Sequence, residues 1–286
     1  MHTIVGATGH VGSALAEALI RSGEPVTVVT HDAGKRTGWE RRGATVAVAD
    51  VHDVARLREV FRAGRRVFLL NPPADVAGDT DGAERESVRC LLEALDGSGA
   101  EQVVALSTMG VQPGDRLGDL NVLHELEQGL RAQPIPASVV RGAYYFTNWD
   151  LQLGAIRDGG VLTTMLPADL AIPMAAPHDI GRVAARLMTE PSGHRRTVAV
   201  EGPERCTARD VAAAFAAALG RDVRVDVVPR ERWKTAFRAQ GFSAPAAESY
   251  ARMTATLVDG REFPPPDERG STTLEDHVAA LVGRSR

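Results

Sequence analysis

The fold is decided by residues 3–15, which read Thr3-Ile4-Val5-Gly6-Ala7-Thr8-Gly9-His10-Val11-Gly12-Ser13-Ala14-Leu15. A β-branched run ends in three glycines at a three-residue spacing, and an alanine- and leucine-rich helical pattern follows at once. This order predicts a strand, a tight turn and a helix. Gly6 permits the turn, Gly9 lets the backbone approach a pyrophosphate, and Gly12 allows the helix to pack closely on the strand. The free N–H groups at the helix start then face the phosphates, so the stretch predicts a dinucleotide site.

Strand and helix patterns alternate through the first half of the chain. Apolar strands are expected at residues 25–30, 45–49, 66–70, 102–107 and 137–141. Helices are expected between them, at residues 11–22, 54–63, 82–95 and 120–132. Continuous apolar strands separated by helices predict a parallel sheet that is covered on both faces. Together with the glycine-rich stretch, this pattern predicts an α/β fold of the Rossmann type, with a doubly wound parallel sheet.

The second half is less regular, and we expect it to form a smaller lobe. Residues 144–158 have a helical pattern, and residues 167–177 are rich in proline and alanine and are interpreted as a connector. We therefore place an NAD(P)-binding domain at residues 1–150 and a smaller carboxyl-terminal α/β lobe at residues 151–286. Substrates of such folds bind at the carboxyl edge of the sheet, where this lobe would complete the cleft.

Composition argues against several classes of protein. The net charge is −4, from 33 Lys and Arg against 37 Asp and Glu, and no basic run indicates a nucleic-acid partner. No apolar stretch approaches a membrane span, and no secretory leader is expected because the first strand pattern begins almost at Met1. The two cysteines, Cys90 and Cys206, form no metal-ligand cluster and are typical of thiols in a reducing compartment. We expect a cytoplasmic protein without a metal.

The segment after the second strand is expected to select the adenosine end of the cofactor. It reads Thr30-His31-Asp32-Ala33-Gly34-Lys35-Arg36. Asp32 is suited to accept from a ribose 2′-OH, which favours NAD. His31, Lys35 and Arg36 are suited to a 2′-phosphate, which favours NADP, although a solvated turn is the alternative for the basic residues. We expect NADP, with NAD as the second choice.

Three further strand ends are candidates for the cofactor site. Asp50-Val51 closes the third strand, and Asp50 is placed to accept from the adenine amino group; a turn or capping role is the alternative. Asn71-Pro72 follows the fourth strand, where the prolines make a rigid shelf beside the second half of the cofactor. Ser107 ends the fifth strand and Thr108 follows it. Either hydroxyl is positioned to face the nicotinamide or the substrate, with a capping or turn role as the alternative.

Several catalytic patterns are absent from the sequence. Alcohol dehydrogenases of the short-chain class use Tyr-x-x-x-Lys, in which the lysine lowers the pKa of the tyrosine. Here Tyr144, Tyr145 and Tyr250 are followed four residues later by Asn148, Trp149 and Thr254. His124 and Glu127 share a helix face, but no second histidine lies near them in sequence to complete a metal site. A Gly-x-Ser-x-Gly nucleophile motif is missing too, which disfavours a serine hydrolase.

The motifs in combination resemble the NmrA-like branch of atypical short-chain dehydrogenases, which includes NAD(P)H:quinone oxidoreductases. The resemblance covers nearly the whole chain and is more specific than any single motif. It rests on Gly6-Ala7-Thr8-Gly9-x-x-Gly12, Leu106-Ser107-Thr108-Met109-Gly110, Glu127, Pro136-Ala137-Ser138-Val139-Val140-Arg141-Gly142, Phe146-Thr147-Asn148, Val200-Glu201-Gly202-Pro203-Glu204 and Leu219-Gly220-Arg221.

The resemblance implies a Rossmann domain that binds NAD(P), a small carboxyl-terminal lobe, and a substrate cleft between them. It is also compatible with a homodimer. Many members have an arginine near the 2′-phosphate where this chain has His31, and several have a lysine where this chain has Leu123, beside His124. In the glycine loop, the implied cofactor contacts are Gly6, Thr8, Gly9, His10, Val11 and Gly12. The segment that borders the active site in relatives corresponds to Tyr144, Tyr145, Phe146 and Asn148.

Two functions from different classes follow. The first is a reductase that delivers hydride from NAD(P)H to an activated small-molecule acceptor, such as a quinone, enone or iminium. Such acceptors delocalise the incoming charge or already carry a cation, so a tyrosine–lysine pair is unnecessary. Tyr144 or Tyr145 would form the pocket wall or donate a proton weakly, and His124 is a second candidate donor. The alternative is a non-catalytic, NAD(P)-sensing regulator. An open, substrate-sized cleft favours the enzyme, and a cleft filled by side chains favours the sensor.

Overall fold

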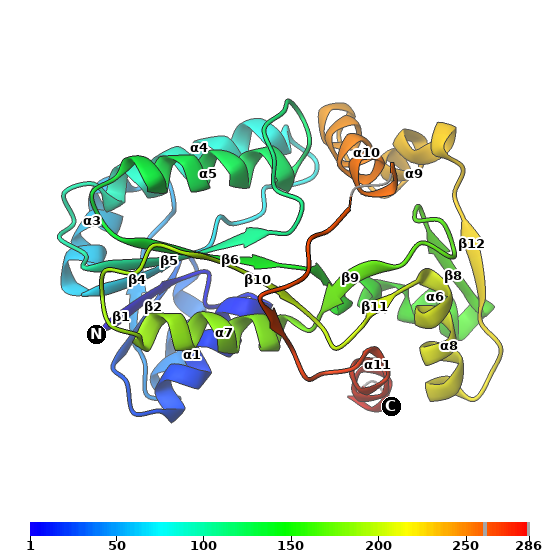
Figure 1. Cartoon of the computed structure of the whole chain (residues 1–286), viewed down its shortest axis with the longest axis horizontal. Coiled ribbons are helices and arrows are strands. Elements are labelled where there is room, and N and C mark those ends of the chain that lie inside the picture. Colours follow the sequence, from blue (N-terminus) through cyan, green and yellow to red (C-terminus); the bar gives the residue numbers. More distant parts are fainter. Residues whose placement is uncertain (260–261, 285–286) are drawn as a thin grey trace.

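A parallel sheet forms the centre of the molecule. The computed structural model describes residues 1–259 and 262–284. Within them the strands of the large sheet are β1 (His2–Val5), β2 (Val26–Thr30), β3 (Thr45–Val48), β4 (Arg66–Leu69), β5 (Gln102–Thr108), β6 (Ala137–Gly142), β10 (Thr197–Glu201) and β13 (Glu268–Arg269). They lie in the order β3-β2-β1-β4-β5-β6-β10-β13, with all neighbours parallel (Figure 1). This is the doubly wound order of dinucleotide-binding folds, so the predicted Rossmann-type α/β class is confirmed.

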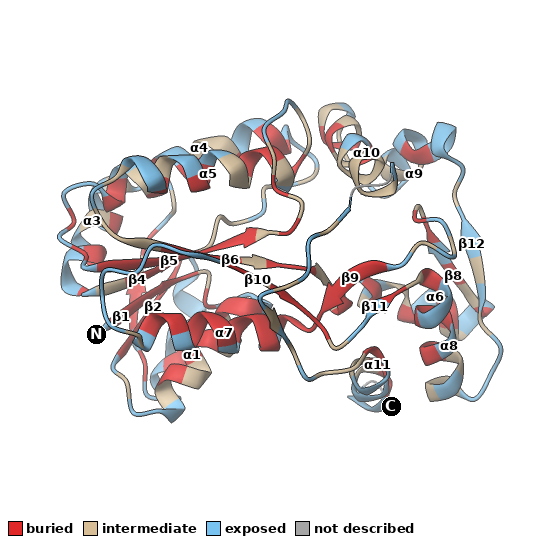
Figure 2. Ribbon diagram, in the orientation of Figure 1, coloured by how far each residue is buried: buried red, intermediate tan, exposed pale blue. Residues whose placement is uncertain are grey.

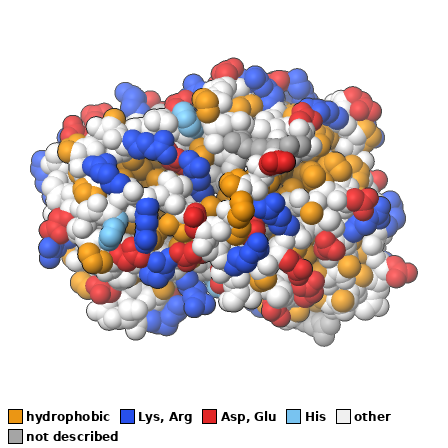
Figure 3. Space-filling model, in the orientation of Figure 1, with side chains coloured by type: hydrophobic (Ala, Val, Ile, Leu, Met, Phe, Trp, Pro, Cys, Tyr) orange, Lys and Arg blue, Asp and Glu red, His pale blue; other side chains and the backbone are white. Residues whose placement is uncertain are grey.

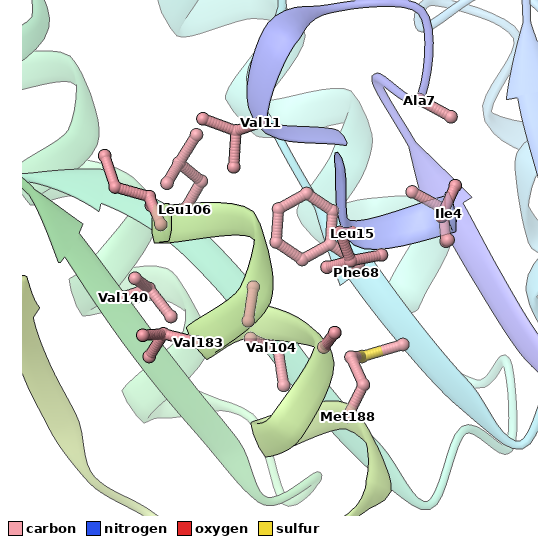
Figure 4. Close-up of a cluster of buried hydrophobic side chains, with 14 of the residues drawn as sticks. Ile4, Ala7, Val11, Leu15, Phe68, Val104, Leu106, Val140, Val183 and Met188 are labelled. Carbon is pink, nitrogen blue, oxygen red and sulfur yellow. The ribbon is translucent and has the colours of Figure 1, made fainter. Parts of the chain in front are cut away.

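Both faces of the sheet are apolar, because successive residues of a strand point to opposite sides. In β1, Ile4 packs with α1 (His10–Arg21) and α7 (Pro177–Thr189), and Figure 4 shows part of this cluster. The next residue, Val5, packs on the other face with α3 (Val54–Ala63), α4 (Thr80–Leu95) and α5 (Asp119–Ala132). Helices therefore cover the sheet on both faces, and the strands between them are mostly buried (Figure 2).

Helices α1 and α7 approach each other closely because Gly181 has no side chain. A Cβ at this position would lie 2.7 Å from the carbonyl oxygen of Val11 and 2.8 Å from the Cβ of Ala14. Pro177 stands in the first turn of α7, where a missing N–H costs no helical hydrogen bond. A helix from the second half of the chain is thus fixed against the helix that follows the glycine loop.

The remainder of the second half forms a smaller lobe around its own apolar cluster, which buries Phe146, Trp149 and Phe215 (Figure 1). In the described part of the chain its strands are β7 (Tyr144–Tyr145), β8 (Val161–Thr164), β9 (Ile172–Ala175), β11 (Arg205–Cys206) and β12 (Arg224–Val227), paired as β11-β9-β7 and β12-β8. The α-helices are α6 (Leu153–Gly159), α8 (Ala208–Leu219), α9 (Trp233–Ala239), α10 (Ala244–Val258) and α11 (Leu274–Arg284). Residues 1–259 and 262–284 also form the short helix α2 (Arg36–Glu40) and the 3-10 helices η1 (Ala33–Lys35), η2 (Phe146–Gln152) and η3 (Arg230–Arg232).

The structure departs from the predicted elements in the second half. Residues 144–158, predicted as one helix, contain β7, then the 3-10 helix η2, and only then α6. The predicted connector at residues 167–177 contains β9. Strands of two to four residues are too short to show a reliable alternating pattern, which explains both errors. Residues after 150 also return to the large sheet, where β10 pairs with β6. The functional division at residue 150 stays a prediction.

The surface carries charges of both signs. Lys and Arg intermix with Asp and Glu over the face that Figure 3 shows, without a broad area of one sign. Among the large apolar side chains, Leu151 is the most exposed, at 95%, and it lies in η2. Across residues 1–259 and 262–284, the structure contains no helix with the length and apolar character needed to span a bilayer.

Candidate active site

A cleft of about 920 Å³ lies at the carboxyl ends of the parallel strands. The large sheet lines it with residues that follow β1, β4 and β6 and with the end of β5, namely residues 9–11, 70–71, 106–110 and 143. The smaller lobe lines the opposite side with residues of η2, β8, α9 and α10, among them Trp149, Thr164, Phe237 and Met253. Open α/β sheets bind ligands at this edge, so the cleft is the candidate active site.

The glycine loop at one end of the cleft has the geometry that the sequence predicts. Gly6 adopts a φ of +79°, which L side chains rarely adopt, and the N–H of Gly9 donates to its carbonyl oxygen at 3.0 Å. A Cβ on Gly12 would lie only 2.2 Å from the same oxygen, so the helix reaches the loop only because this residue is glycine. A Cβ on Gly9 would meet that oxygen at 3.5 Å, an ordinary contact, so the fold itself does not require glycine there.

Two observations test whether this loop fits the phosphates of a dinucleotide. Gly9 is the N-cap of α1 and offers no side chain to the first N–H groups, and the first turn of the helix holds no acidic residue. His10 and Val11, the first two residues of α1, line the cleft with Gly9. Unpaired N–H groups at a helix start bind anions well. Asn71 follows β4, the strand beside β1 in the sheet, and its Oδ1 is buried and lacks a partner among the described residues. The residues present therefore fit a dinucleotide.

The residues predicted for the adenosine end lie at the ends of β2 and β3, outside the lining of the cleft. Asp32 caps η1 by accepting from the N–H of Gly34 at 2.8 Å, and His31 and Lys35 are exposed beside it. Asp50 accepts from the N–H of His52 at 2.8 Å, so the alternative turn role is observed. Thr8, Val51 and Pro72 are also absent from the cleft lining. The contacts of all these residues with a cofactor stay predictions.

The hydroxyls at the end of β5 are already engaged. Ser107 lines the cleft, but its hydroxyl donates to Glu127 at 2.7 Å. The same carboxylate accepts from Nε and Nη2 of Arg141 at 2.9 and 2.7 Å. Thr108 donates to the carbonyl oxygen of Met109 at 3.2 Å, which is the local turn role considered above. In this structure neither hydroxyl is directed to a ligand.

The aromatic residues predicted at the active site form one wall of the cleft. Tyr144 and Tyr145 both line it, and the ring centroids of Tyr144 and Trp149 are 5.9 Å apart. Burial raises the pKa of Tyr144 to about 12 and also raises the pKa of Tyr145, so both phenols hold their protons tightly. His124 does not line the cleft; its Nε2 lies 3.2 Å from the amide nitrogen of Gln128, and Leu123 lines the cleft instead.

Sequence reasoning missed one charged residue of the cleft, Asp119. It is the first residue of α5, preceded by Gly118 with a φ of +58°, and its side chain is exposed. The sequence signal was a carboxylate at the start of the helix that follows the fifth strand. An aspartate in that position belongs to none of the sequence motifs described above.

Comparisons with known proteins agree with this architecture. The model of the NmrA-like family matches residues 2–274. The NAD(P)H azoreductase of Xenophilus azovorans is 24% identical over 286 residues, which cover 99% of this chain and 93% of that protein. The (4-alkanoyl-5-oxo-2,5-dihydrofuran-3-yl)methyl phosphate reductase of Streptomyces griseus is 29% identical over 251 residues, or 87% of this chain and 84% of that protein.

A similar fold is found among solved structures. The NADPH-dependent quinone oxidoreductase of Escherichia coli, in complex with NADPH, superposes with a TM-score of 0.83 at 21% sequence identity. The match covers 98% of this chain and 99% of that chain. At this level of identity, the likeness shows a shared fold.

Proposed function

Because the chain belongs to the NmrA-like family, we propose that it is an NAD(P)H-dependent reductase of an activated small-molecule acceptor, such as a quinone, an enone or an iminium. The observation that carries the proposal is the open cleft of about 920 Å³, which begins at the glycine loop. Its volume lies within the range of roughly 300–1,000 Å³ that is typical of ligand sites. Curated relatives named as an azoreductase and a furanone-phosphate reductase support the same reaction class.

Residues of this chain account for cofactor binding in the proposal. Gly6, Gly9 and Gly12 shape the loop, and the N–H groups at the start of α1 receive the pyrophosphate. When bound, the reduced nicotinamide supplies the hydride. His31 directly follows β2 and Lys35 lies in η1; both are exposed, and both are suited to donate to a 2′-phosphate, which favours NADP over NAD.

The walls of the cleft select the kind of acceptor. Tyr144, Tyr145 and Trp149 present rings on one side, and Phe237 and Phe263 add two more from the smaller lobe and the segment before β13. Such surfaces stack against flat conjugated molecules and exclude water from them. Orientation of a conjugated acceptor beside the cofactor lowers the barrier by itself, since fixed reactants do not lose translational freedom in the transition state.

A regulator that binds NAD(P) without turnover is the competing function. That reading predicts a cleft filled by side chains such as Tyr145 or Trp149. Both residues form the wall of the cleft instead of filling it, and this supports the reductase. Homodimerisation remains a prediction.

The experiment that tests the proposal compares cofactor binding with cofactor oxidation. Purified protein is mixed with NADPH and then NADH, and the absorbance of the reduced cofactor is followed with a panel of quinones, enones, cyclic iminium salts and azo compounds. We expect acceptor-dependent oxidation with at least one class, and its loss in Gly9→Val, which obstructs the phosphate loop. Tight NADPH binding without oxidation by any acceptor would contradict the reductase and favour the regulator.

A further inference from the structure

A reductase of neutral acceptors requires a proton donor, and the residues predicted for that role are poorly placed or poorly acidic. Tyr144 and Tyr145 have raised pKa values because they are buried. His124 is absent from the cleft lining and lies against Gln128. Another group that reaches the cleft is therefore the better candidate for the proton donor.

We propose that Asp119 is the proton donor of this active site. Its side chain lines the cleft from the first turn of α5, beside Leu120 and one helical turn from Leu123. Among the described residues, its carboxyl has neither a hydrogen bond nor an ion pair. It is thus free to contact a ligand, whereas the carboxylate of Glu127 on the same helix is fully engaged by Ser107 and Arg141.

The surroundings of Asp119 favour the protonated carboxyl. No Lys or Arg lies among the described residues that line the cleft, although the chain has 33 of them. Three other groups interact electrostatically with Asp119, namely Glu84 of α4, Tyr145 of β7 and Tyr250 of α10. All three are neutral when protonated, so none of them supplies a positive charge that would favour the ionised form of Asp119. His10 is the cleft's remaining titratable group, at the start of α1.

Desolvation acts in the same direction. The side chain of Asp119 is open to the cleft, yet protein surrounds the carboxyl on its other sides and raises its pKa. The N-terminus of α5 acts in the opposite direction, because the helix dipole favours the ionised form. An acceptor that fills the cleft displaces the remaining water, and the carboxyl then holds its proton more strongly. Carboxyl groups in apolar pockets act as general acids for this reason.

The proposed step balances in atoms and electrons. A neutral enone gains a hydride at its β-carbon, a C–H bond forms, and the C=C electron pair shifts until the carbonyl oxygen carries the negative charge. That oxygen forms an O–H bond with the proton of Asp119, and the O–H bond of the carboxyl breaks. NADPH is the reductant and leaves as NADP⁺, while Asp119 regains a proton from water at the cleft mouth.

This inference rests on the proposed function and narrows the range of expected acceptors. With Asp119 as proton donor, the expected acceptors are neutral molecules that become anionic at oxygen or nitrogen when they receive hydride, such as enones, quinones and azo compounds. An iminium acceptor becomes neutral on reduction and needs no proton in that step. An ionised Asp119 would instead attract such a cation, which is the competing role for this residue.

The first test measures the proton itself, in the free protein. Infrared difference spectra of wild type minus Asp119→Asn are recorded across a pH titration, and the carbonyl band of a protonated carboxyl is followed. We expect the band of Asp119 to persist well above the range in which an ordinary aspartate ionises. Asp115→Asn serves as the matched control, since Asp115 is exposed in the loop before α5 and lies outside the cleft lining. A band that disappears in the ordinary aspartate range would overturn the proposal.

The second test uses kinetics with two acceptor classes. For a neutral enone or quinone, Asp119→Asn should lower kcat by about 100-fold or more, the usual contribution of a general acid. Asp119→Glu should restore part of kcat, and Asp115→Asn should match wild type. With an iminium salt, kcat of Asp119→Asn should stay within about twofold of wild type. Thermal melts and NADPH titrations establish that each variant folds and binds the cofactor.

The outcomes separate the two proposals. Wild-type kcat in Asp119→Asn with neutral acceptors would overturn the donor role and leave the reductase intact. An increase in KM for the iminium alone would likewise overturn it and identify Asp119 as a cation-binding residue. If none of the acceptors in the panel causes the wild-type protein to oxidise NADPH, the proposed function is wrong. The catalytic role of Asp119 is then wrong as well, whatever the infrared band shows.

Discussion

Ser107, at the carboxyl end of β5, donates a hydrogen bond of 2.7 Å to Glu127, whose side chain is only 1% exposed. The partner that neutralises this buried carboxylate is Arg141 at the end of β6, through two hydrogen bonds. Burial would raise the pKa of Glu127, but the hydrogen bonds from Arg141 and Ser107 outweigh it and lower the pKa. One helix is thereby joined to two neighbouring strands directly behind the cleft.

Replacement of Arg141 should therefore destabilise the protein. Arg141→Ala leaves Glu127 buried with a weaker set of partners, and we expect a loss of roughly 3 kcal/mol in the free energy of unfolding. Arg131→Ala is the control, because Arg131 also reaches Glu127, at 3.2 Å, but its side chain is 54% exposed. That variant should lose no more than about 1 kcal/mol. Urea unfolding at pH 7 measures both losses.

The pair of Glu127 and Arg141 also predicts that the free energy of unfolding depends on pH. The folded-state pKa of Glu127 lies below its unfolded value, so its contribution to stability is present above the unfolded pKa and is lost as the pH falls through the folded one. The difference between wild type and Arg141→Ala should accordingly shrink in acid. Equal losses for the two arginine variants, or a difference that does not depend on pH, would contradict this account of the network.

Substitutions of Gly9 and Gly12 test the cofactor loop more sharply, because one should weaken NADPH binding and the other should weaken the fold. Gly12→Ala places a Cβ 2.2 Å from the carbonyl oxygen of Gly6, and we expect a loss of roughly 2 kcal/mol or more in stability. Gly9→Ala makes only an ordinary contact and has an allowed φ of −91°, so its melting temperature should match wild type. Its Kd for NADPH should nevertheless rise at least tenfold, as measured by fluorescence titration. If Gly9→Ala binds NADPH as tightly as wild type, the phosphates of the cofactor do not bind at this loop.

Much of the fold could be predicted because the strands of the first half are apolar and most of them are followed by a helical pattern. Ile4 and Val5 are examples, because both side chains are buried, on opposite faces of the sheet. A strand that is buried on both faces gives a continuous apolar stretch in the sequence. The strand β7 was missed because its two residues precede a 3-10 helix that has a helical pattern of its own. No local signal distinguishes two extended residues whose partner, β9, lies about thirty residues away.

The site was less predictable than the fold because it depends on where side chains point. The glycine loop carries its geometry in the sequence, since a positive φ and a close approach both require glycine. Ser107 shows the limit: the sequence places it at the right strand end, but the direction of its hydroxyl is set by Glu127, twenty residues further on. Asp119 is identified as a cleft residue only in the structure, because the smaller lobe forms the other side of the cleft that Asp119 lines.

The choice between NADP and NAD should respond to position 31. His31 and Lys35 are exposed in the segment that follows β2, where the 2′-phosphate is predicted to lie. In His31→Arg, a fixed charge with several donors should strengthen NADPH binding relative to NADH by about tenfold, the effect of one good charge-assisted hydrogen bond. Arg42→Ala, in the turn that follows α2, should leave the ratio of the two Kd values unchanged. An unchanged ratio in His31→Arg would mean that the 2′-phosphate binds elsewhere.

A last prediction concerns Glu84, a buried carboxyl of α4 that is 3% exposed and has no cationic partner among residues 1–259 and 262–284. Its Oε1 accepts from the N–H of Ala74 at 3.1 Å. Burial, with like charge from Asp119 and Asp81, raises the pKa of Glu84 to about 7. Because this value lies above the unfolded one, the folded protein binds a proton that the unfolded chain releases. Stability should therefore fall as the pH rises from about 4.5 to 7 and then level off.

Glu84→Gln removes this titration and keeps an oxygen that accepts from Ala74. We expect equal stability of variant and wild type near pH 4.5, and a variant that is more stable at pH 8 by up to roughly 3 kcal/mol, the value of a shift of this size. Glu93→Gln makes the same chemical change on the exposed side of α4 and should alter neither value. Urea unfolding at the two pH values measures the difference. A Glu84→Gln protein that gains no stability at pH 8 would show that the carboxylate of Glu84 finds a cation or water in solution.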